Sequence, residues 1–262
     1  MGTAITTQNL FEIARQARAS RNAKVWIRPD GRVALAPMEG PSLGRLTMDV
    51  QEVHVHPRRD DDALELMARL REDFPNAKFH GFSPGWLARH GMDRLSQLGL
   101  DSLCWFTGEL GQDGPASQGW QELGEHEIPK IGVFLYGPEH SWQQVEDRVG
   151  QMSQARNLLQ VVPLPRAVGD LVVIPGATTD GTQDIELLAR CRRMLPSGVR
   201  VRASWAALGW KMAQSSLAFG CDALAGWGME EQLAYSGRMR PADLVGEDEV
   251  LAGLREAGME SL

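Results

Sequence analysis

Short runs of apolar and β-branched residues alternate along this chain with longer stretches in which apolar residues recur at helical spacing. The short runs predict strands, and the longer stretches predict helices between them. The predicted strands are Arg32–Leu35, Val50–His56, Ala77–Phe82, Ser102–Phe106, Ile131–Tyr136, Leu159–Pro163, Leu171–Ile174, Val199–Ser204 and Ala223–Trp227. Regular alternation of this kind is typical of a parallel sheet whose strands are joined by crossover helices.

The stretches between the strands carry start and stop signals for helices. Asp60–Phe74 opens with acidic residues, which a helix N-terminus favours, and ends at Pro75. Ser141 and Gln144 have the spacing of a capping box, so a helix is expected from there to about Asn157. Further helices are predicted for Thr6–Asn22, Thr182–Leu195 and Leu208–Phe219.

The chain length and the number of strands favour a barrel. The chain has 262 residues, close to the roughly 250 that are typical of a (β/α)8 barrel. We therefore expect an α/β fold of the (β/α)8 TIM type, complete or partly open, in residues 31–262. A helical segment in residues 1–30 is expected to pack on it. Thr107–Gly119 and Pro175–Gln183 follow strands, so these loops are expected on the face where barrels build their sites.

Composition and charge narrow the class of protein. A hydrophobic content of 43% and a charged content of 23% are ordinary for a globular protein. The net charge of −7 argues against a surface that binds nucleic acid, which needs a basic stripe. The sequence shows no apolar run of membrane-spanning length, no secretion signal at its start, and three widely separated cysteines. We expect a cytoplasmic protein that does not bind membranes.

Several segments resemble one group of enzymes. VRASWAALGWKMAQSSLAFGCDALAGWGMEEQ (Val201–Gln232), GLDSLCWFTGEL (Gly99–Leu110), KFHGFSPGWL (Lys78–Leu87) and Phe134–Leu158 occur in the order and spacing found there. The chain resembles the radical S-adenosylmethionine (SAM) enzymes of menaquinone biosynthesis, aminofutalosine synthase and dehypoxanthine futalosine cyclase, and their deazaflavin-pathway relatives. The resemblance implies common ancestry and a radical SAM-like barrel.

The chain differs from that group in the segments that bind the group's cofactors. The group carries a CxxxCxxC loop after its first strand, whereas Ala36–Asp49 contains no cysteine. Thiolates hold a [4Fe–4S] cluster, and the only cysteines are Cys104, Cys191 and Cys221. The strand end EVHVHPRR (Glu52–Arg59) also lacks the glycine pair associated with SAM. We therefore expect no cofactor, neither a [4Fe–4S] cluster nor a conventional SAM site, and no conventional radical SAM activity.

Some polar residues at predicted strand ends are candidates for a remaining site. Glu109 matches a glutamate of the resembled group; it is suited to bind ribose hydroxyls or to act as a catalytic base, or it is a solvated loop acid. Arg202 is suited to bind a carboxylate, and Trp205 offers a stacking face unless it packs in the core. The full predicted ligand-binding set is His80, Glu109, Tyr136, Arg202, Ser204 and Trp205.

His54 and His56 suggest a different class of site. Side chains two apart on a strand point to the same face, so both could converge on one divalent metal ion, as in metal-dependent TIM-barrel hydrolases. The alternative is that they are hydrogen-bonded wall residues with no metal. No metal is therefore favoured, and the His54/His56 metal site is kept as the alternative.

These observations favour a non-radical, radical SAM-like pseudoenzyme that binds a ligand or serves as an accessory subunit. The expected ligand is a nucleoside or an aromatic acid, and the expected partner, if any, is a homologous radical SAM subunit. The alternatives are the metal-dependent hydrolase and a purely structural interaction protein. The sequence leaves open whether any reaction is catalysed.

Overall fold

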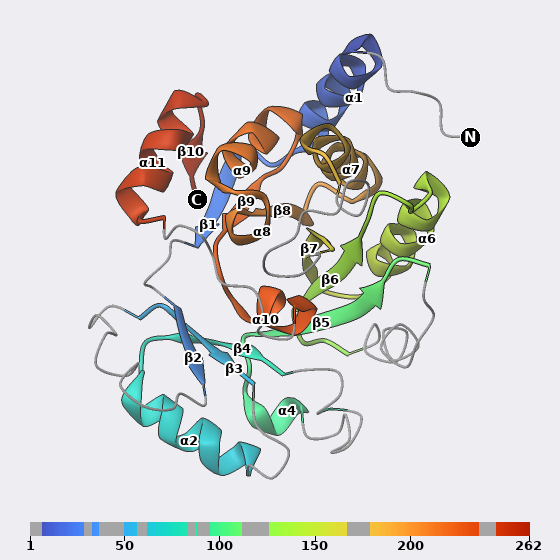
Figure 1. Ribbon diagram of the computed structural model, residues 1–262. Helices are drawn as coiled ribbons and strands as arrows, with labels where there is room; N and C mark the ends of the chain where they lie inside the picture. Colours follow the sequence, from blue (N-terminus) through green and yellow to red (C-terminus); the bar gives the residue numbers. More distant parts are fainter. Residues whose placement is uncertain are drawn as a thin grey trace.

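The fold is a ten-stranded, all-parallel sheet in the order β10-β1-β9-β8-β7-β6-β5-β4-β3-β2 (Figure 1). This computed structural model describes residues 7–28, 33–36, 50–56, 62–82, 87, 95–111, 126–166, 179–235 and 245–262. The strands are β1 (Lys24–Arg28), β2 (Val33–Ala36), β3 (Glu52–Val55), β4 (Lys78–Gly81), β5 (Ser102–Glu109), β6 (Lys130–Tyr136), β7 (Leu158–Pro165), β8 (Arg200–Ser204), β9 (Ala223–Ala225) and β10 (Glu260–Ser261).

The helices lie before the first strand or between successive strands. They are α1 (Thr7–Ser20), α2 (Ala63–Asp73), α4 (Leu95–Leu98), α6 (Trp142–Ser153), α7 (Gly181–Met194), α8 (Trp205–Leu208), α9 (Trp210–Ser216), the 3-10 turn η3 (Leu217–Phe219), α10 (Met229–Tyr235) and α11 (Glu247–Glu256). The capping box predicted at Ser141 and Gln144 is present at the start of α6. Among the described residues, no helix combines the length and the apolar character needed to cross a bilayer.

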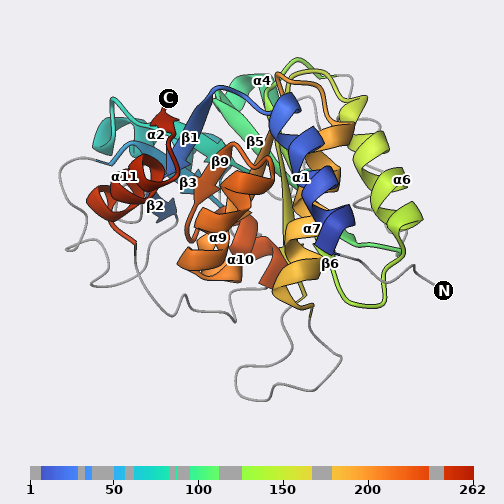
Figure 2. The same cartoon turned by 90° about the horizontal axis from the view of Figure 1, so that it is seen from above.

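The expected fold class is confirmed in its partly open form. In the described part of the chain, β2 and β10 are the two edges of the sheet and do not pair with each other. The helices α1, α6 and α7 cover its outer side, seen from above in Figure 2. The N-terminal helix α1 packs there against α7 and η3. The result is a half-barrel rather than a closed cylinder.

The strand predictions hold to within a few residues where the structure describes them. The predicted strand Leu171–Ile174 lies outside the described residues. Sequence reasoning missed β1 and β10. Residues 1–30 therefore contribute a strand in addition to α1: β1 pairs with β9, with Trp26 opposite Ala223.

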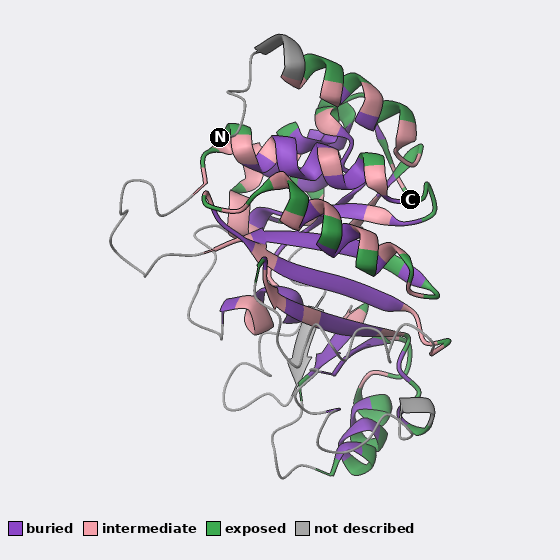
Figure 3. Cartoon of the chain, turned by 90° about the vertical axis from the view of Figure 1, so that its right-hand side faces the viewer, coloured by how far each residue is buried: buried purple, intermediate pink, exposed green. Residues whose placement is uncertain are grey.

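Alternation along the strands separates two apolar layers. Leu103 and Trp105 of β5 belong to the outer core beneath the surrounding helices, whereas Cys104 packs in an inner apolar layer. Figure 3 shows the central strands buried along their length, with the helices exposing one face. This inner apolar layer joins β5, β6 and β7 to α10, which contributes Met229 and Tyr235 to it. Helix α10 therefore lies on the inner side of the half-barrel (Figure 1).

Candidate functional site

A cluster of buried charged residues lies beside α10 on the inner side of the sheet. It combines residues from five elements that are far apart in the sequence. Its members are Arg28 of β1, Glu52 and His54 of β3, His80 of β4, Arg202 and Ser204 of β8, and Glu230 and Glu231 of α10. Of the six strand residues, Arg28, His54, His80, Arg202 and Ser204 are each less than 5% exposed, and the side chain of Glu52 is 20% exposed. We call this set the inner cluster.

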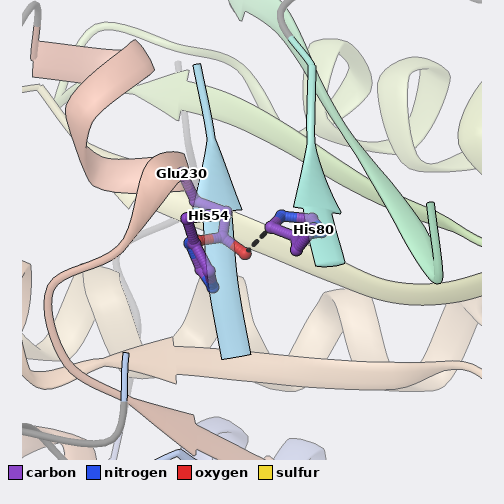
Figure 4. Close-up of side chains that lie close together, drawn as sticks. All are labelled: His54, His80 and Glu230. Carbon is purple, nitrogen blue, oxygen red and sulfur yellow. Dashed lines mark ion pairs between the residues drawn. The ribbon is translucent and has the colours of Figure 1, made fainter. Parts of the chain in front are cut away.

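The carboxylate of Glu230 is the centre of the inner cluster. Its Oε1 accepts hydrogen bonds from Arg202 Nη1 at 2.7 Å and from Arg28 Nη1 at 3.3 Å, and its Oε2 accepts one from Arg28 Nη2 at 3.1 Å. His80 Nε2 lies 3.3 Å from the same Oε1 (Figure 4). Burial alone favours the neutral acid, but Arg202 and Arg28 hold the pKa of Glu230 well below its usual value. Glu230 is therefore ionised.

His54 links α10 to β3 in a defined tautomer. Its Nδ1 accepts the backbone N–H of Met229 at 2.9 Å, so the ring proton is on Nε2. Nε2 lies 3.2 Å from Glu52 Oε2, which accepts its proton. Burial and the nearby Arg28 lower the pKa of His54 to about 4, so the ring is neutral at pH 7.

A second polar group lies where β5, β6 and β7 end. Arg166, directly after β7, donates from Nη1 to Glu109 Oε1 at 2.7 Å and also pairs with Glu139. His140 Nε2 is 3.9 Å from Glu109 Oε1, and His140 Nδ1 accepts the backbone N–H of Gly137 at 2.6 Å. These residues are partly exposed and lie at the carboxyl ends of parallel strands, where such folds place their sites. We call this set the mouth cluster.

Neither cluster suits a metal ion as it stands. Within the described residues, the donor atoms of His54, His80 and Glu230 converge, as do those of Glu109, Glu139 and His140. In each group one imidazole accepts a backbone N–H at Nδ1, so its Nε2 carries the proton and offers no lone pair. Arg28 and Arg202 also place two positive charges on Glu230. The predicted partner His56 is exposed, just beyond β3, and is in neither group.

The structure brings only part of the predicted ligand-binding set together. His80, Arg202 and Ser204 are in the inner cluster, and Glu109 is in the mouth cluster. Tyr136 and Trp205 point instead into the outer core. The Tyr136 hydroxyl donates to Asp184 at 2.8 Å.

Sequence reasoning missed Arg28, Glu52, Glu230, Glu231 and Arg166 as site residues. The adjacent pair Glu230 and Glu231 was a usable signal, because it interrupts an otherwise apolar stretch after Trp227. Charged residues in such a stretch are almost never fully buried unless they are paired. Arg28 gave no comparable signal, since its strand had not been predicted.

The three cysteines do not fit a [4Fe–4S] cluster. Cys104 is in the apolar inner layer on β5, whereas Cys191 and Cys221 lie in the outer core. All three are fully buried. Burial raises the pKa of each thiol, that of Cys221 to about 12. A cluster needs several thiolates around one centre, and these side chains are on opposite faces of the sheet.

Comparisons with known proteins find distant sequence relatives and solved structures of the same fold. No family model matches the chain. Its curated relatives include 5-amino-6-(D-ribitylamino)uracil–L-tyrosine 4-hydroxyphenyl transferases: transferase 2 of Methanosarcina barkeri (24% identical over 230 residues, 75% of this chain) and transferase 1 of Methanosarcina mazei (26% over 230 residues, 74% of this chain). The chain spans about 60% of the length of these relatives.

Solved structures show the same fold. Methylornithine synthase (PylB) superposes with a TM-score of 0.65 at 13% identity, covering 98% of this chain and 90% of that chain. HydG, a maturase of the [FeFe]-hydrogenase, gives a TM-score of 0.63 at 11% identity over 98% of this chain and 70% of its own. The deazaflavin-pathway part of the predicted resemblance is thus supported, and its futalosine-pathway part stays a prediction. The chain is therefore similar in sequence to these hydroxyphenyl transferases and similar in fold to methylornithine synthase and HydG.

Proposed function

We propose that the chain is a non-radical, ligand-binding protein on a radical SAM-like half-barrel. The observation that carries this proposal is the placement of the cysteines. Cys104 is separated from Cys191 and Cys221 by the sheet itself, so no rearrangement of side chains alone gathers three thiolates. The chain retains the scaffold and polar clusters on its inner side and at its mouth, which suits binding rather than radical chemistry.

The mouth cluster is the proposed contact point for the ligand. Arg166 is about one-third exposed and is flanked by the carboxylates of Glu109 and Glu139. The carboxylates of Glu109 and Glu139 suit hydroxyl or amino groups of a ligand. The names of the relatives include L-tyrosine, an aromatic amino acid, and a ribityl-substituted uracil, which resembles a nucleoside. We propose a ligand of one of these two classes.

The first test asks whether a cluster assembles. The purified chain is treated anaerobically with iron and sulfide, with the Methanosarcina mazei transferase treated in parallel. We expect no stoichiometric iron–sulfur absorbance and no reductive cleavage of SAM by this chain. A reconstituted cluster that cleaves SAM would show the non-radical proposal to be wrong.

The second test asks what binds. L-Tyrosine and 5-amino-6-(D-ribitylamino)uracil are titrated by calorimetry into the wild type and into Glu109→Gln. We expect one of them to bind, and Glu109→Gln to weaken it about tenfold or more, the effect of losing one charged hydrogen bond. Glu127→Gln is the control, because its side chain is 75% exposed beside Arg156. Absence of binding by both compounds would count against the ligand-binding proposal.

Two predictions made from the sequence remain alternatives. The accessory-subunit prediction, with a homologous radical SAM partner, is tested by native mass spectrometry of the chain purified gently from its own cells. The same spectrum tests the His54/His56 metal prediction, against which the tautomer of His54 argues. Stoichiometric metal that is lost in a His54→Ala, His56→Ala variant would restore the hydrolase hypothesis.

A further inference from the structure

The arginine pair of the inner cluster holds a carboxylate that comes from the chain itself. Arg28 and Arg202 are on β1 and β8, which flank β9 in the sheet, and both point to the inner side. Arg28 donates from two different nitrogens to the two oxygens of Glu230. This is the bidentate geometry by which arginine binds a free carboxylate. Arg202 adds the shortest of these contacts, at 2.7 Å. The carboxylate that they bind belongs to α10, a seven-residue helix, and not to a strand of the sheet.

The inner cluster has hydrogen-bonding capacity that Glu230 does not use. Within the described residues, three buried guanidinium nitrogens of this cluster lack a hydrogen bond: Arg28 Nε, Arg202 Nε and Arg202 Nη2. All three nitrogens are donors. Unsatisfied buried donors are uncommon in native proteins, and here they belong to two neighbouring guanidinium groups. A ligand group that accepts hydrogen bonds would therefore complement these guanidinium donors.

We propose that Arg28, Arg202 and His80 form a carboxylate-binding site that the chain's own Glu230 occupies as an internal ligand. A small external carboxylate takes this position when Glu230 is withdrawn. One part of this proposal rests on the proposed function: if the natural ligand has a carboxylate, that carboxylate competes with Glu230 and displaces α10. The existence of the site itself does not depend on which natural ligand is bound.

The first test is chemical rescue. Glu230→Ala leaves two buried guanidinium groups without their central counterion and removes the volume of the carboxylate arm. We expect a lowered melting temperature that acetate restores in a saturable manner, by about 5 °C or more at saturation. Acetamide, the neutral compound of the same shape, is expected to restore nothing. Equal effects of acetate and acetamide, or no effect of either, would overturn the proposal.

A matched variant separates this site from a general effect of acetate. Glu231→Ala removes the neighbouring buried carboxyl of α10, whose oxygens lie 3.6 Å from Arg202 Nη2 and 4.0 Å from Arg28 Nη2. We expect no rescue of that variant by acetate. If Glu230→Ala is recovered only unfolded, the refolding yield in acetate is compared with the yield in acetamide. A higher yield in acetate supports the site, and equal yields contradict it.

A measurement on the wild type tests displacement. Hydrogen exchange of residues 229–235 is followed with and without saturating L-tyrosine. We expect faster exchange in this segment when the amino acid binds. Binding without faster exchange would refute displacement while leaving the proposed function intact. Absence of binding would refute the ligand class, with the acetate experiment still deciding whether the site exists.

Discussion

At the scale of single residues, the stability of the inner side of this half-barrel depends on the pairing of its buried charges. Glu230 is fully buried and makes three hydrogen bonds to guanidinium groups, so its charge is stabilised by direct contacts rather than by water. Removing one partner of such a pair is far more damaging than removing a pair on the surface, because the remaining charge stays buried.

We therefore expect Arg202→Met to destabilise the fold by about 3–5 kcal/mol. The buried carboxylate of Glu230 would lose its 2.7 Å partner. Arg156→Met provides the comparison: its pair with Glu127 has side chains 61% and 75% exposed, and such pairs are worth about 1 kcal/mol or less. Urea unfolding of both variants measures the difference. Equal losses would mean that Glu230 is not held as described.

His54 makes stability depend on pH. Its pKa is about 4 in the folded chain and 6.5 in the unfolded chain. The unfolded chain therefore takes up the proton first as the pH falls. Stability is therefore complete above pH 6.5 and is lost progressively down to pH 4, by about 3 kcal/mol in total from this group. We expect His54→Gln to flatten the stability curve between pH 6.5 and 4.5 in urea unfolding.

The control for this variant is His56→Gln, which replaces the exposed histidine two residues away. It is expected to leave the wild-type pH dependence in place. A wild-type curve that is already flat over this range would contradict the buried, neutral state of His54.

At the scale of elements, α10 is fixed at both ends. Its first N–H is bound by His54, and the hydroxyl of its last residue, Tyr235, donates to the carbonyl of Pro165 at 2.7 Å. The residue before it, Gly228, lies against Arg28: a Cβ there would stand 2.3 Å from Arg28 Nη2. That guanidinium is held by Glu230 and cannot move aside freely.

Gly228→Ala should consequently destabilise the protein by about 1–3 kcal/mol through overpacking. Gly150→Ala is the matched control, because Gly150 lies inside α6 with nothing near the added Cβ. That change should stabilise by about 0.5–1 kcal/mol, since alanine is the better helix former. Thermal unfolding of the two variants is expected to give shifts of opposite sign. Shifts of the same sign would mean that Arg28 is not fixed.

The elements were largely predictable from the sequence, and the site only in part. Long strands such as β6 combine a continuous apolar run with clear turn signals, and the ends of α6 are marked by Ser141 and Gln144. β1 was missed because KVWIR is short and bounded by charges, and its pairing with β9 joins residues about 200 positions apart. Arg28 and Glu230 meet only through that long-range pairing, which local pattern does not encode.

At the scale of the whole molecule, the fold separates its thiols from solvent and separates Cys104 from Cys191 and Cys221. All three cysteines are fully buried, with pKa values raised by burial, so a thiol reagent has access only when the structure opens. Labelling with a chromogenic disulfide should be slow for the native chain and rapid in denaturant. Rapid labelling of a native thiol would show that its part of the core opens locally.

The arrangement of the inner cluster also constrains how the sequence can vary among homologues. Arg28, Arg202 and Glu230 are on three distant segments, yet each is stable in the interior only with the others present. Positions 28, 202 and 230 should thus covary as a triplet. A homologue with an apolar residue at 230 is expected to have replaced both arginines, and its inner side would be a different binding surface.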